Sequence, residues 1–191
     1  SETVIRKSET VIRTSEIAFQ KSDIVIRKSG NPDISAWRFD PWRSLLPNYR
    51  GAAPINWAII NNETTTGATT FYIDDKIDTG AILLKEELVI QPNETVGSLH
   101  DKLAPLGANL ILKTLDYIET NPTPKPQLLT GDEKEAPKLT KENTKIDWKH
   151  SLKYIDGLIR GLSPYPVAWL EIQNGESILK AKIFKATPSF E

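Results

Sequence analysis

An aspartate in a short loop is the first residue of this sequence that could carry chemistry. Asp78 lies in the stretch DDKIDTG, at 74–80, between two segments that are rich in strand-forming residues. A loop between strands can hold a carboxylate rigidly over a pocket. The alternative is a turn aspartate that bonds its own backbone, and the local sequence alone favours that structural role.

A second candidate is the run Ser44, Leu45, Leu46 and Pro47, called the SLLP segment below. It could line a ligand site, or it could be a tight turn that contributes two leucines to the core. Arg50 follows it and could meet an anionic part of a ligand, although a lone arginine is more often solvated or part of a structural pair.

Composition excludes several kinds of site. The chain has no cysteine, so disulfides, thiolate metal sites and a cysteine nucleophile are absent. Its two histidines, His100 and His150, lack metal-ligand spacing, and we expect no metal. The formal charge of −1 gives the whole chain no polyanion-binding signature. No apolar run approaches the ~18 residues of a membrane span and no signal-peptide core appears, so we expect no membrane partner. The lack of cysteine fits a reducing cytoplasm, where we expect the protein.

The chain begins with a seven-residue repeat over 1–28, written SETVIRK, SETVIRT, SEIAFQK and SDIVIRK. Its apolar residues are adjacent β-branched pairs, which do not form the seam of a coiled coil. Two interpretations remain open: a translated tandem repeat with no evolved fold, or a short structured array. The turn-rich stretch at 29–35 marks a boundary after it.

The next segment predicts mixed secondary structure. Short apolar and β-rich runs predict a helix over 53–60 and strands over 68–73 and 81–90. Apolar residues at helical spacing predict a long helix over 95–120, with Thr95 as its cap. Pro105 is expected to kink or split that helix.

The last part of the chain contains a linker, a helix and a hairpin. Prolines and charges over 121–143 predict an extended linker. A helical stripe over 152–159 is followed by Gly161 and Pro164, which are expected to stop the helix. Two β-rich runs then flank Asn174-Gly175, the preferred pair of a type I′ turn. One hairpin is marginal alone, so we expect a second domain that is cut short.

Three lysines in the second half of that hairpin region are Lys180, Lys182 and Lys185. They could face the phosphates of a nucleic acid. They could equally form the solvated face of an edge strand, which the local sequence favours.

From Ser44 to Ile90 the sequence, beginning SLLPNYRGAAPINW, resembles the catalytic domain of the methionyl-tRNA formyltransferase family. APKLTKE…IDW, followed by LIRGLSPYPVAWLEI, is similar to that family's linker and to the start of its C-terminal domain. The resemblance covers about 39–186, and several motifs occur in the family's order. It implies an α/β fold: the C-terminal half of a Rossmann-like formyltransferase domain, followed by the start of a small β-barrel domain.

The resemblance also implies boundaries and partners. The implied parts are a repeat segment outside the family fold at 1–35, a partial catalytic domain at 36–120, a linker at 121–145 and a truncated C-terminal domain at 146–191. We therefore expect a chain that is incomplete at both ends and monomeric. The implied reaction moves a formyl group from 10-formyltetrahydrofolate to the amino group of initiator methionyl-tRNA, in translation initiation.

The family pattern is an asparagine and a histidine before the SLLP segment, and an aspartate in Asp-Thr-Gly. Asp78 matches that aspartate, and the SLLP segment matches the run that lines the folate site. The histidine and asparagine positions hold Trp42 and Asp40 instead, so we expect impaired activity. Ala81 stands where the family has a further carboxylate. The match falls away abruptly before Ser44, so we expect 1–43 not to be homologous to the family.

Two other functions remain open. One is a different folate-dependent formyltransferase, acting on a sugar amine or a glycinamide ribotide; the IRGLSPYP segment favours the tRNA enzyme or a sugar-amine relative over the ribotide enzyme. The other is a non-catalytic module that keeps a remnant of the folate pocket or uses the repeat as an interaction arm.

Overall fold

A four-stranded sheet forms the centre of the computed structural model, which describes residues 44–72, 78–120, 122–123 and 125–187 together with the backbone of 24–26 and 37–42. Its strands are β1 (Ile24–Ile26), β2 (Trp37–Trp42), β4 (Thr65–Tyr72) and β5 (Ile82–Val89), in the order β1-β2-β4-β5. Neighbouring strands in this sheet are antiparallel. Of the repeat expected over 1–28, β1 alone lies within the described residues, and the two interpretations of the remainder fall outside them.

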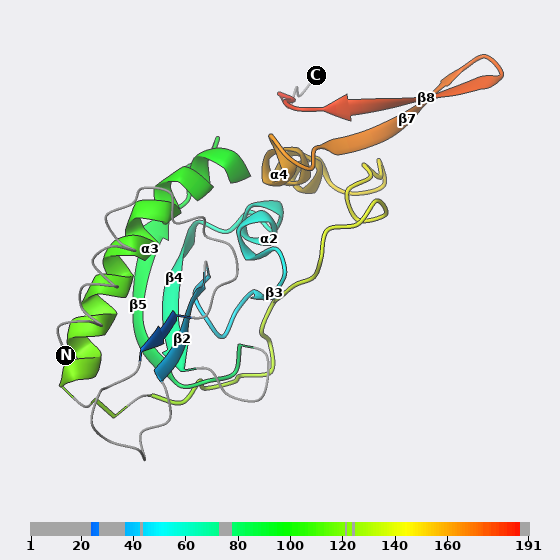
Figure 1. Ribbon diagram of the computed structural model, residues 1–191. Coiled ribbons are helices and arrows are strands. Elements are labelled where there is room, and N and C mark those ends of the chain that lie inside the picture. The colour runs from blue at the N-terminus through cyan, green and yellow to red at the C-terminus, as the bar shows by residue number, and fades with distance from the viewer. Residues whose placement is uncertain are drawn as a thin grey trace.

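The long helix α3 (Val96–Glu119) runs along one side of the sheet (Figure 1). Its expected cap at Thr95 is confirmed. The Thr95 hydroxyl accepts a hydrogen bond from the Ser98 N–H at 3.2 Å, and the Ser98 hydroxyl accepts one from the Thr95 N–H at 3.1 Å. This reciprocal pair satisfies two backbone donors that have no partner inside the helix.

Pro105 does not split α3, which continues through it as one helix. The proline lies on the exposed side, where water can bond the carbonyl that loses its helical partner. Leu103 and Leu110, on either side of it, are 2% and 1% exposed. Their packing holds both halves of the helix against the core.

The short helix α2 (Pro54–Ile60) packs against α4 (Leu152–Leu162) at very close range. A Cβ added to Gly157 would lie 2.7 Å from the Ile60 carbonyl oxygen, and one added to Gly161 would lie 2.9 Å from the Asn56 carbonyl oxygen. The expectation that Gly161 stops α4 is therefore wrong, since the helix continues to Leu162. Gly161 instead lets the two helices approach, and it contributes its own carbonyl to a hydrogen bond from the Asn56 amide at 2.7 Å.

One core cluster joins α2 and α4 to the hairpin. Its buried members are Ile60, Ile146, Ile155, Leu158, Ile159, Leu162, Ala168 and Leu170. The hairpin consists of β7 (Ala168–Asn174) and β8 (Ser177–Ile183), and it extends away from the sheet in Figure 1.

The turn of this hairpin lies one residue later than its sequence predicts. Asn174 pairs with Ser177, so the two-residue loop is Gly175-Glu176 rather than Asn174-Gly175. Gly175 has a φ of 61°, which a residue without a Cβ adopts readily. Glycine at the first loop position is the arrangement of a type II′ turn, which also suits the twist of the paired strands.

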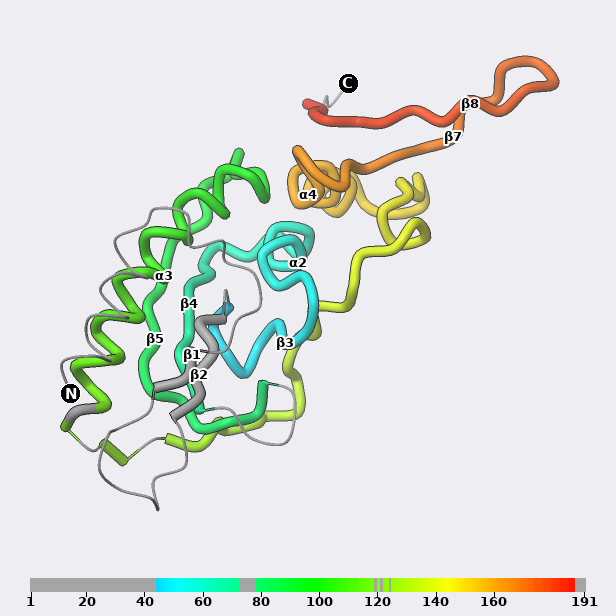
Figure 2. Tube along the Cα trace, viewed as in Figure 1, coloured from blue at the N-terminus to red at the C-terminus, as the bar shows by residue number. Residues whose placement is uncertain are grey.

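The segment after α3 crosses the end of the sheet before it rises to α4 (Figure 2). Within it, β6 (Glu135–Ala136) pairs in parallel with β3 (Arg50–Gly51). Lys125 forms an antiparallel bridge with Ile82 at the start of β5. The linker is therefore bonded to the four-stranded sheet at the start of β5, and to β3 through the separate two-stranded sheet β3-β6. Among the described helices, none has the length and apolar character that crossing a bilayer requires.

Candidate functional site

The SLLP segment is bound to the sheet by a buried threonine of β4. Thr69 is 0% exposed; its hydroxyl donates to the Ser44 carbonyl at 2.7 Å and accepts from the Leu46 N–H at 3.2 Å. Leu46 itself is fully buried, so this leucine makes the contribution to the core that was expected of it. Its backbone N–H is hydrogen-bonded to Thr69 at the same time. The backbone of the segment is therefore fixed at Ser44 and Leu46.

Lys85 of β5 also bonds this segment, from the same face of the sheet as Thr69. It pairs in register with Thr69, and its ammonium donates to the carbonyl of Leu46. Partial burial lowers the pKa of Lys85, while the nearby Glu87 carboxylate acts in the opposite direction. Sequence reasoning missed both Thr69 and Lys85. The only signal was their position on adjacent β-rich runs, which does not specify what they bond.

Asp78 is 8% exposed and lies directly before β5 in a left-handed backbone conformation, with a φ of 57°. Gly80 follows at a point where a Cβ would lie 1.4 Å from the Tyr72 carbonyl oxygen, so only glycine fits there. The side-chain amide of Gln127 donates to the carbonyls of Asp78 and Gly80, at 2.9 Å and 2.8 Å. The loop therefore packs closely against the backbone of β4 and is hydrogen-bonded to the linker.

Arg50 forms the structural pair that its sequence context favours. Its Nη2 donates to the Gln127 side-chain oxygen at 2.5 Å. Its Nε is buried and has no hydrogen-bond partner among the described residues. A guanidinium held in this way retains an N–H that could meet an anionic group, and a ligand role for Arg50 stays a prediction.

The two positions that depart from the family pattern lie on β2. Backbone pairing places Trp42 opposite Thr69 and Asp40 opposite Phe71. Trp42 is therefore in register with the threonine that holds the SLLP segment. Ala81, the third departure, accepts a hydrogen bond from the Tyr72 N–H at 2.9 Å through its carbonyl.

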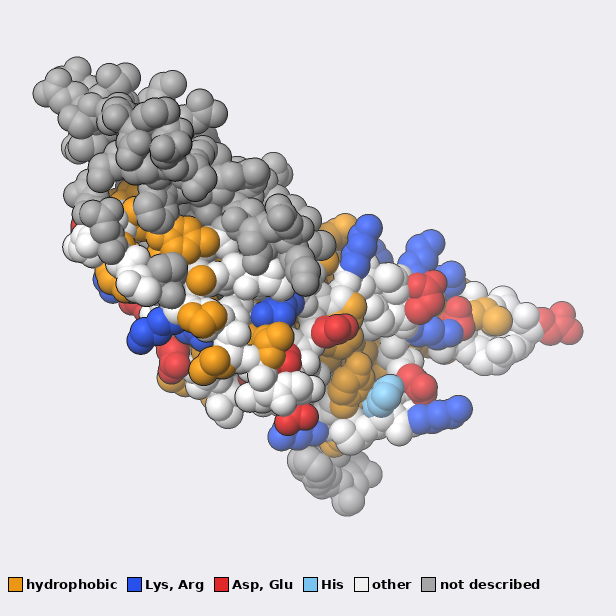
Figure 3. All heavy atoms as spheres, turned by 90° about the horizontal axis from the view of Figure 1, so that it is seen from below, with side chains coloured by type: hydrophobic (Ala, Val, Ile, Leu, Met, Phe, Trp, Pro, Cys, Tyr) orange, Lys and Arg blue, Asp and Glu red, His pale blue; other side chains and the backbone are white. Residues whose placement is uncertain are grey.

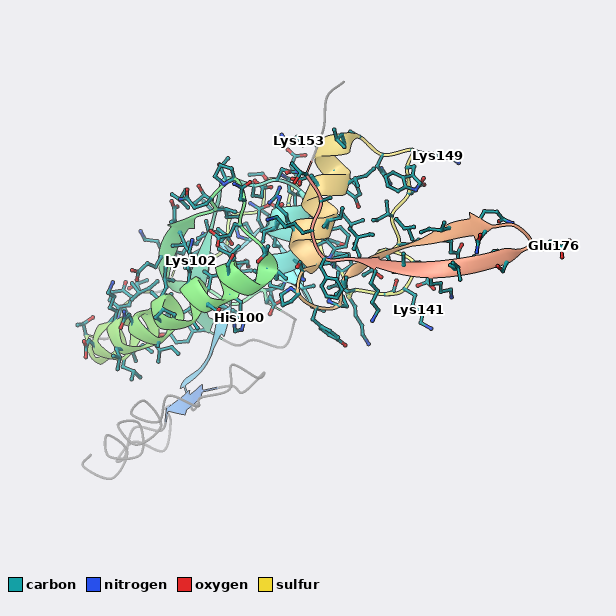
Figure 4. All side chains as sticks on the ribbon, turned by 90° about the horizontal axis from the view of Figure 1, so that it is seen from above. His100, Lys102, Lys141, Lys149, Lys153 and Glu176 are labelled. Atoms are coloured by element: carbon teal, nitrogen blue, oxygen red, sulfur yellow. The ribbon has the colours of Figure 1, made fainter. Side chains whose placement is uncertain are left out.

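The histidines are used elsewhere. His100 lies in α3 (Figure 4) and is half exposed. Its Nδ1 is 3.5 Å from the Asp101 carboxylate. His150 packs its ring against Tyr154 at a centroid separation of 4.4 Å. Within the described ranges, no group of three or more histidine, aspartate or glutamate side chains could hold a metal ion.

A groove of about 480 Å³ lies between the linker and the hairpin rather than at Asp78. Lys180 and Lys182, two of the lysines singled out in the sequence, line it with Lys141 and Trp169. The ammonium groups of Lys145 and Lys180 each lie 5.2 Å from the Trp169 ring centroid. Figure 4 shows Lys141 beside the hairpin. On the face of the molecule drawn in Figure 3, basic and acidic side chains are interspersed.

Two family sequence models match the chain in succession. The formyl transferase model matches residues 42–115, and the model of the formyl transferase C-terminal domain matches residues 138–190. The first match begins close to the abrupt edge seen before Ser44.

Curated relatives align with most of the chain. It is 55% identical over 149 residues to a methionyl-tRNA formyltransferase from Flavobacterium johnsoniae, covering 78% of this chain and 47% of that enzyme. It is 44% identical over 160 residues to a methionyl-tRNA formyltransferase from Bacteroides thetaiotaomicron, covering 80% of this chain and 49% of that enzyme. The chain thus spans about half the length of the curated relatives it matches.

Solved structures share the α/β fold. A protein from Mycobacterium tuberculosis described as a likely sugar N-formyltransferase aligns with a TM-score of 0.63 at 20% identity, over 80% of this chain and 66% of that one. A 4-N formyltransferase from Francisella tularensis aligns with a TM-score of 0.62 at 22% identity, over 78% of this chain and 63% of that one.

Proposed function

The chain belongs to the formyl transferase family, and we propose that it is part of a methionyl-tRNA formyltransferase, which moves a formyl group from 10-formyltetrahydrofolate to the amino group of initiator methionyl-tRNA. The observation that carries this proposal is the succession of both family domains in one chain, at 55% identity to a relative of that name. We propose that the protein acts as a cytoplasmic monomer in translation initiation. The domain boundaries given by the sequence, 36–120, 121–145 and 146–191, are part of the same proposal.

The geometry supports distinct roles for two parts of the site. The SLLP segment, fixed by Thr69 and Lys85, would line the folate. The Asp78 carboxylate would manage the proton that the attacking amine loses and the proton that the leaving folate nitrogen gains. Asp78 is 8% exposed, which supports a defined position for its carboxylate.

The proposed reaction also requires groups that this chain does not carry at the matching positions. Attack on a formyl carbon places negative charge on the formyl oxygen, which needs hydrogen-bond donors. An ionised Asp40 would repel that charge, and Trp42 can donate but cannot titrate. Losing one oxyanion donor lowers the rate by about 10²–10³-fold. Losing acid–base help lowers it by about 10²–10⁴-fold. We therefore expect weak formyl transfer.

Two assays test the proposal in sequence. Titration with 5-formyltetrahydrofolate, a stable analogue of the donor, should show saturable binding by the full chain. Absence of binding at high micromolar concentration would overturn both the enzyme function and a folate-binding module. Formyl transfer to methionyl-tRNA, measured beside an intact relative, should be slower by several orders of magnitude and should disappear in Asp78→Asn. A rate near that of the relative would contradict the assigned effect of Trp42.

The alternative acceptor is tested in the same assay. One structural neighbour, an N-formyltransferase from Helicobacter canadensis, was solved with folinic acid and dTDP-3-aminofucose, at 23% identity. Replacing methionyl-tRNA with that sugar nucleotide should give no transfer. Transfer to the sugar alone would replace the tRNA enzyme with the sugar-amine enzyme.

A further inference from the structure

Gln127 is a linker residue whose side chain connects two separate parts of the candidate site. Its amide nitrogen donates to the carbonyls of Asp78 and Gly80 at 2.9 Å and 2.8 Å, and its oxygen accepts from Arg50 at 2.5 Å. A glutamine amide has two N–H donors, and both are used here. Gln127 is therefore engaged by groups that precede it by tens of residues in the chain.

The loop that Gln127 bonds needs support from outside. Asp78 has a φ of 57°, a left-handed conformation that is unfavourable for a residue with a Cβ. Asp78 and Gly80 are both buried, so bulk water cannot donate hydrogen bonds to their carbonyl oxygens. The two hydrogen bonds from Gln127 meet that need and fix the loop on both sides of Thr79.

The linker delivers Gln127 to this place in a defined register. Two residues earlier, the Lys125 carbonyl accepts from the Ile82 N–H at 2.7 Å, and the Lys125 N–H donates to the Ile82 carbonyl at 3.1 Å. This antiparallel bridge pairs the linker with the first residue of β5. Arg50 belongs to β3, which pairs with β6 farther along the linker, so the partner of the Gln127 oxygen is also fixed.

We infer that Gln127 is a positioning residue, which acts through the backbone of Asp78 and Gly80 to hold the Asp78 carboxylate in place for formyl transfer. The inference rests on the proposed function, because it takes Asp78 as the group that manages the proton. It makes the linker a part of the catalytic centre as well as the connection between the two domains.

Two variants test the inference in the full chain. Gln127→Leu has a similar volume and removes all three hydrogen bonds. Gln127→Glu keeps an acceptor for Arg50 but loses both N–H donors and places negative charge beside two carbonyl oxygens. Gln173→Leu is the matched control, since Gln173 is an exposed glutamine of the hairpin that bonds only its own turn, through the Gly175 carbonyl at 2.7 Å.

Hydrogen exchange of the amides in 79–82 is the first measurement. Both Gln127 variants should exchange there at least about tenfold faster than the unmodified chain, which corresponds to about 1.4 kcal/mol, whereas the control should not change. If Gln127→Leu does not fold, Gln127→Glu decides alone. Unchanged exchange in a folded Gln127→Glu or Gln127→Leu chain would overturn the inference.

The second measurement separates positioning from general stability. Single-turnover formyl transfer should fall at least about tenfold in either variant, while the affinity for 5-formyltetrahydrofolate changes less than about threefold, because the SLLP segment is held independently. Equal losses of transfer and affinity would refute a positioning role. If the unmodified chain binds no folate, the proposed function fails, and the exchange experiment still decides whether Gln127 holds the loop.

Discussion

Replacing Thr69 with valine should release the SLLP segment and destabilise the protein. The hydroxyl of this fully buried residue bonds the Ser44 carbonyl and the Leu46 N–H. Valine has nearly the same shape, so the substitution leaves no large cavity. It does leave one backbone acceptor and one backbone donor without the partner that they have in the intact protein.

The magnitude follows from those two groups. A buried polar group that loses its partner costs about 1–3 kcal/mol, so we expect the free energy of unfolding to fall by about 2–4 kcal/mol after partial relaxation. In a chain of this size 1 kcal/mol lowers the melting temperature by about 2–4 °C, which gives a fall of roughly 5–15 °C. Thr69→Ser is the matched control, because it keeps both hydrogen bonds and loses one methyl group at a cost of about 1 kcal/mol.

Thermal unfolding followed by circular dichroism measures the stability change, and titration with 5-formyltetrahydrofolate measures the state of the segment. Thr69→Val should bind the folate several-fold more weakly than Thr69→Ser at a temperature where both are folded. Equal melting temperatures and equal affinities for the two variants would refute the role assigned to the hydroxyl.

Two further predictions concern packing and pH. Gly157→Ala should lower the melting temperature despite the ~1 kcal/mol gain in helix propensity, because its Cβ would lie 2.7 Å from the Ile60 carbonyl oxygen; a rise in melting temperature would contradict the close α2–α4 contact. Burial alone would raise the pKa of Glu94, but hydrogen bonds from Lys102 and Ser98 and the Lys102 charge outweigh it, so that pKa is lowered from 4.5. The stability that this lowered pKa contributes is present above the unfolded pKa and is lost as pH falls through the folded pKa. Between about pH 6 and pH 3 the melting temperature should therefore fall less in Glu94→Gln than in the unmodified chain. Parallel pH profiles of the two melting temperatures would contradict this.

The elements that follow local rules could be predicted from the sequence. The Thr95 cap, the apolar spacing of α3 and the β-rich runs of β4 and β5 act within a few residues, and each element lies close to its predicted range. The deviations have local causes as well. Exposure of Pro105 let α3 continue, and the strand pairing of Asn174 moved the hairpin turn to Gly175-Glu176.

The family assignment also came from the sequence. The SLLP segment and the linker motifs are contiguous in the chain, so they and their order can be recognised without knowledge of the fold. The assignment of Asp78, the SLLP segment and Arg50 to roles in the reaction stays a prediction. The disabling effect of Trp42 and Asp40 also stays a prediction. For β2 the structure describes the backbone and its register with β4, and neither tests that effect.

The support of the candidate site was decided by the tertiary structure alone. Gln127 is 49 residues from Asp78 and 77 residues from Arg50, and Thr69 is 25 residues from Ser44. No local pattern encodes such pairs, because each depends on the path of the linker across the end of the sheet and on the register of β4 with its neighbours. The sequence by itself determined which residues could carry the chemistry and to which family they belong. Only the folded chain determined which glutamine, threonine and lysine hold them in place, because a side-chain hydrogen bond requires its two partners within about 3 Å of each other.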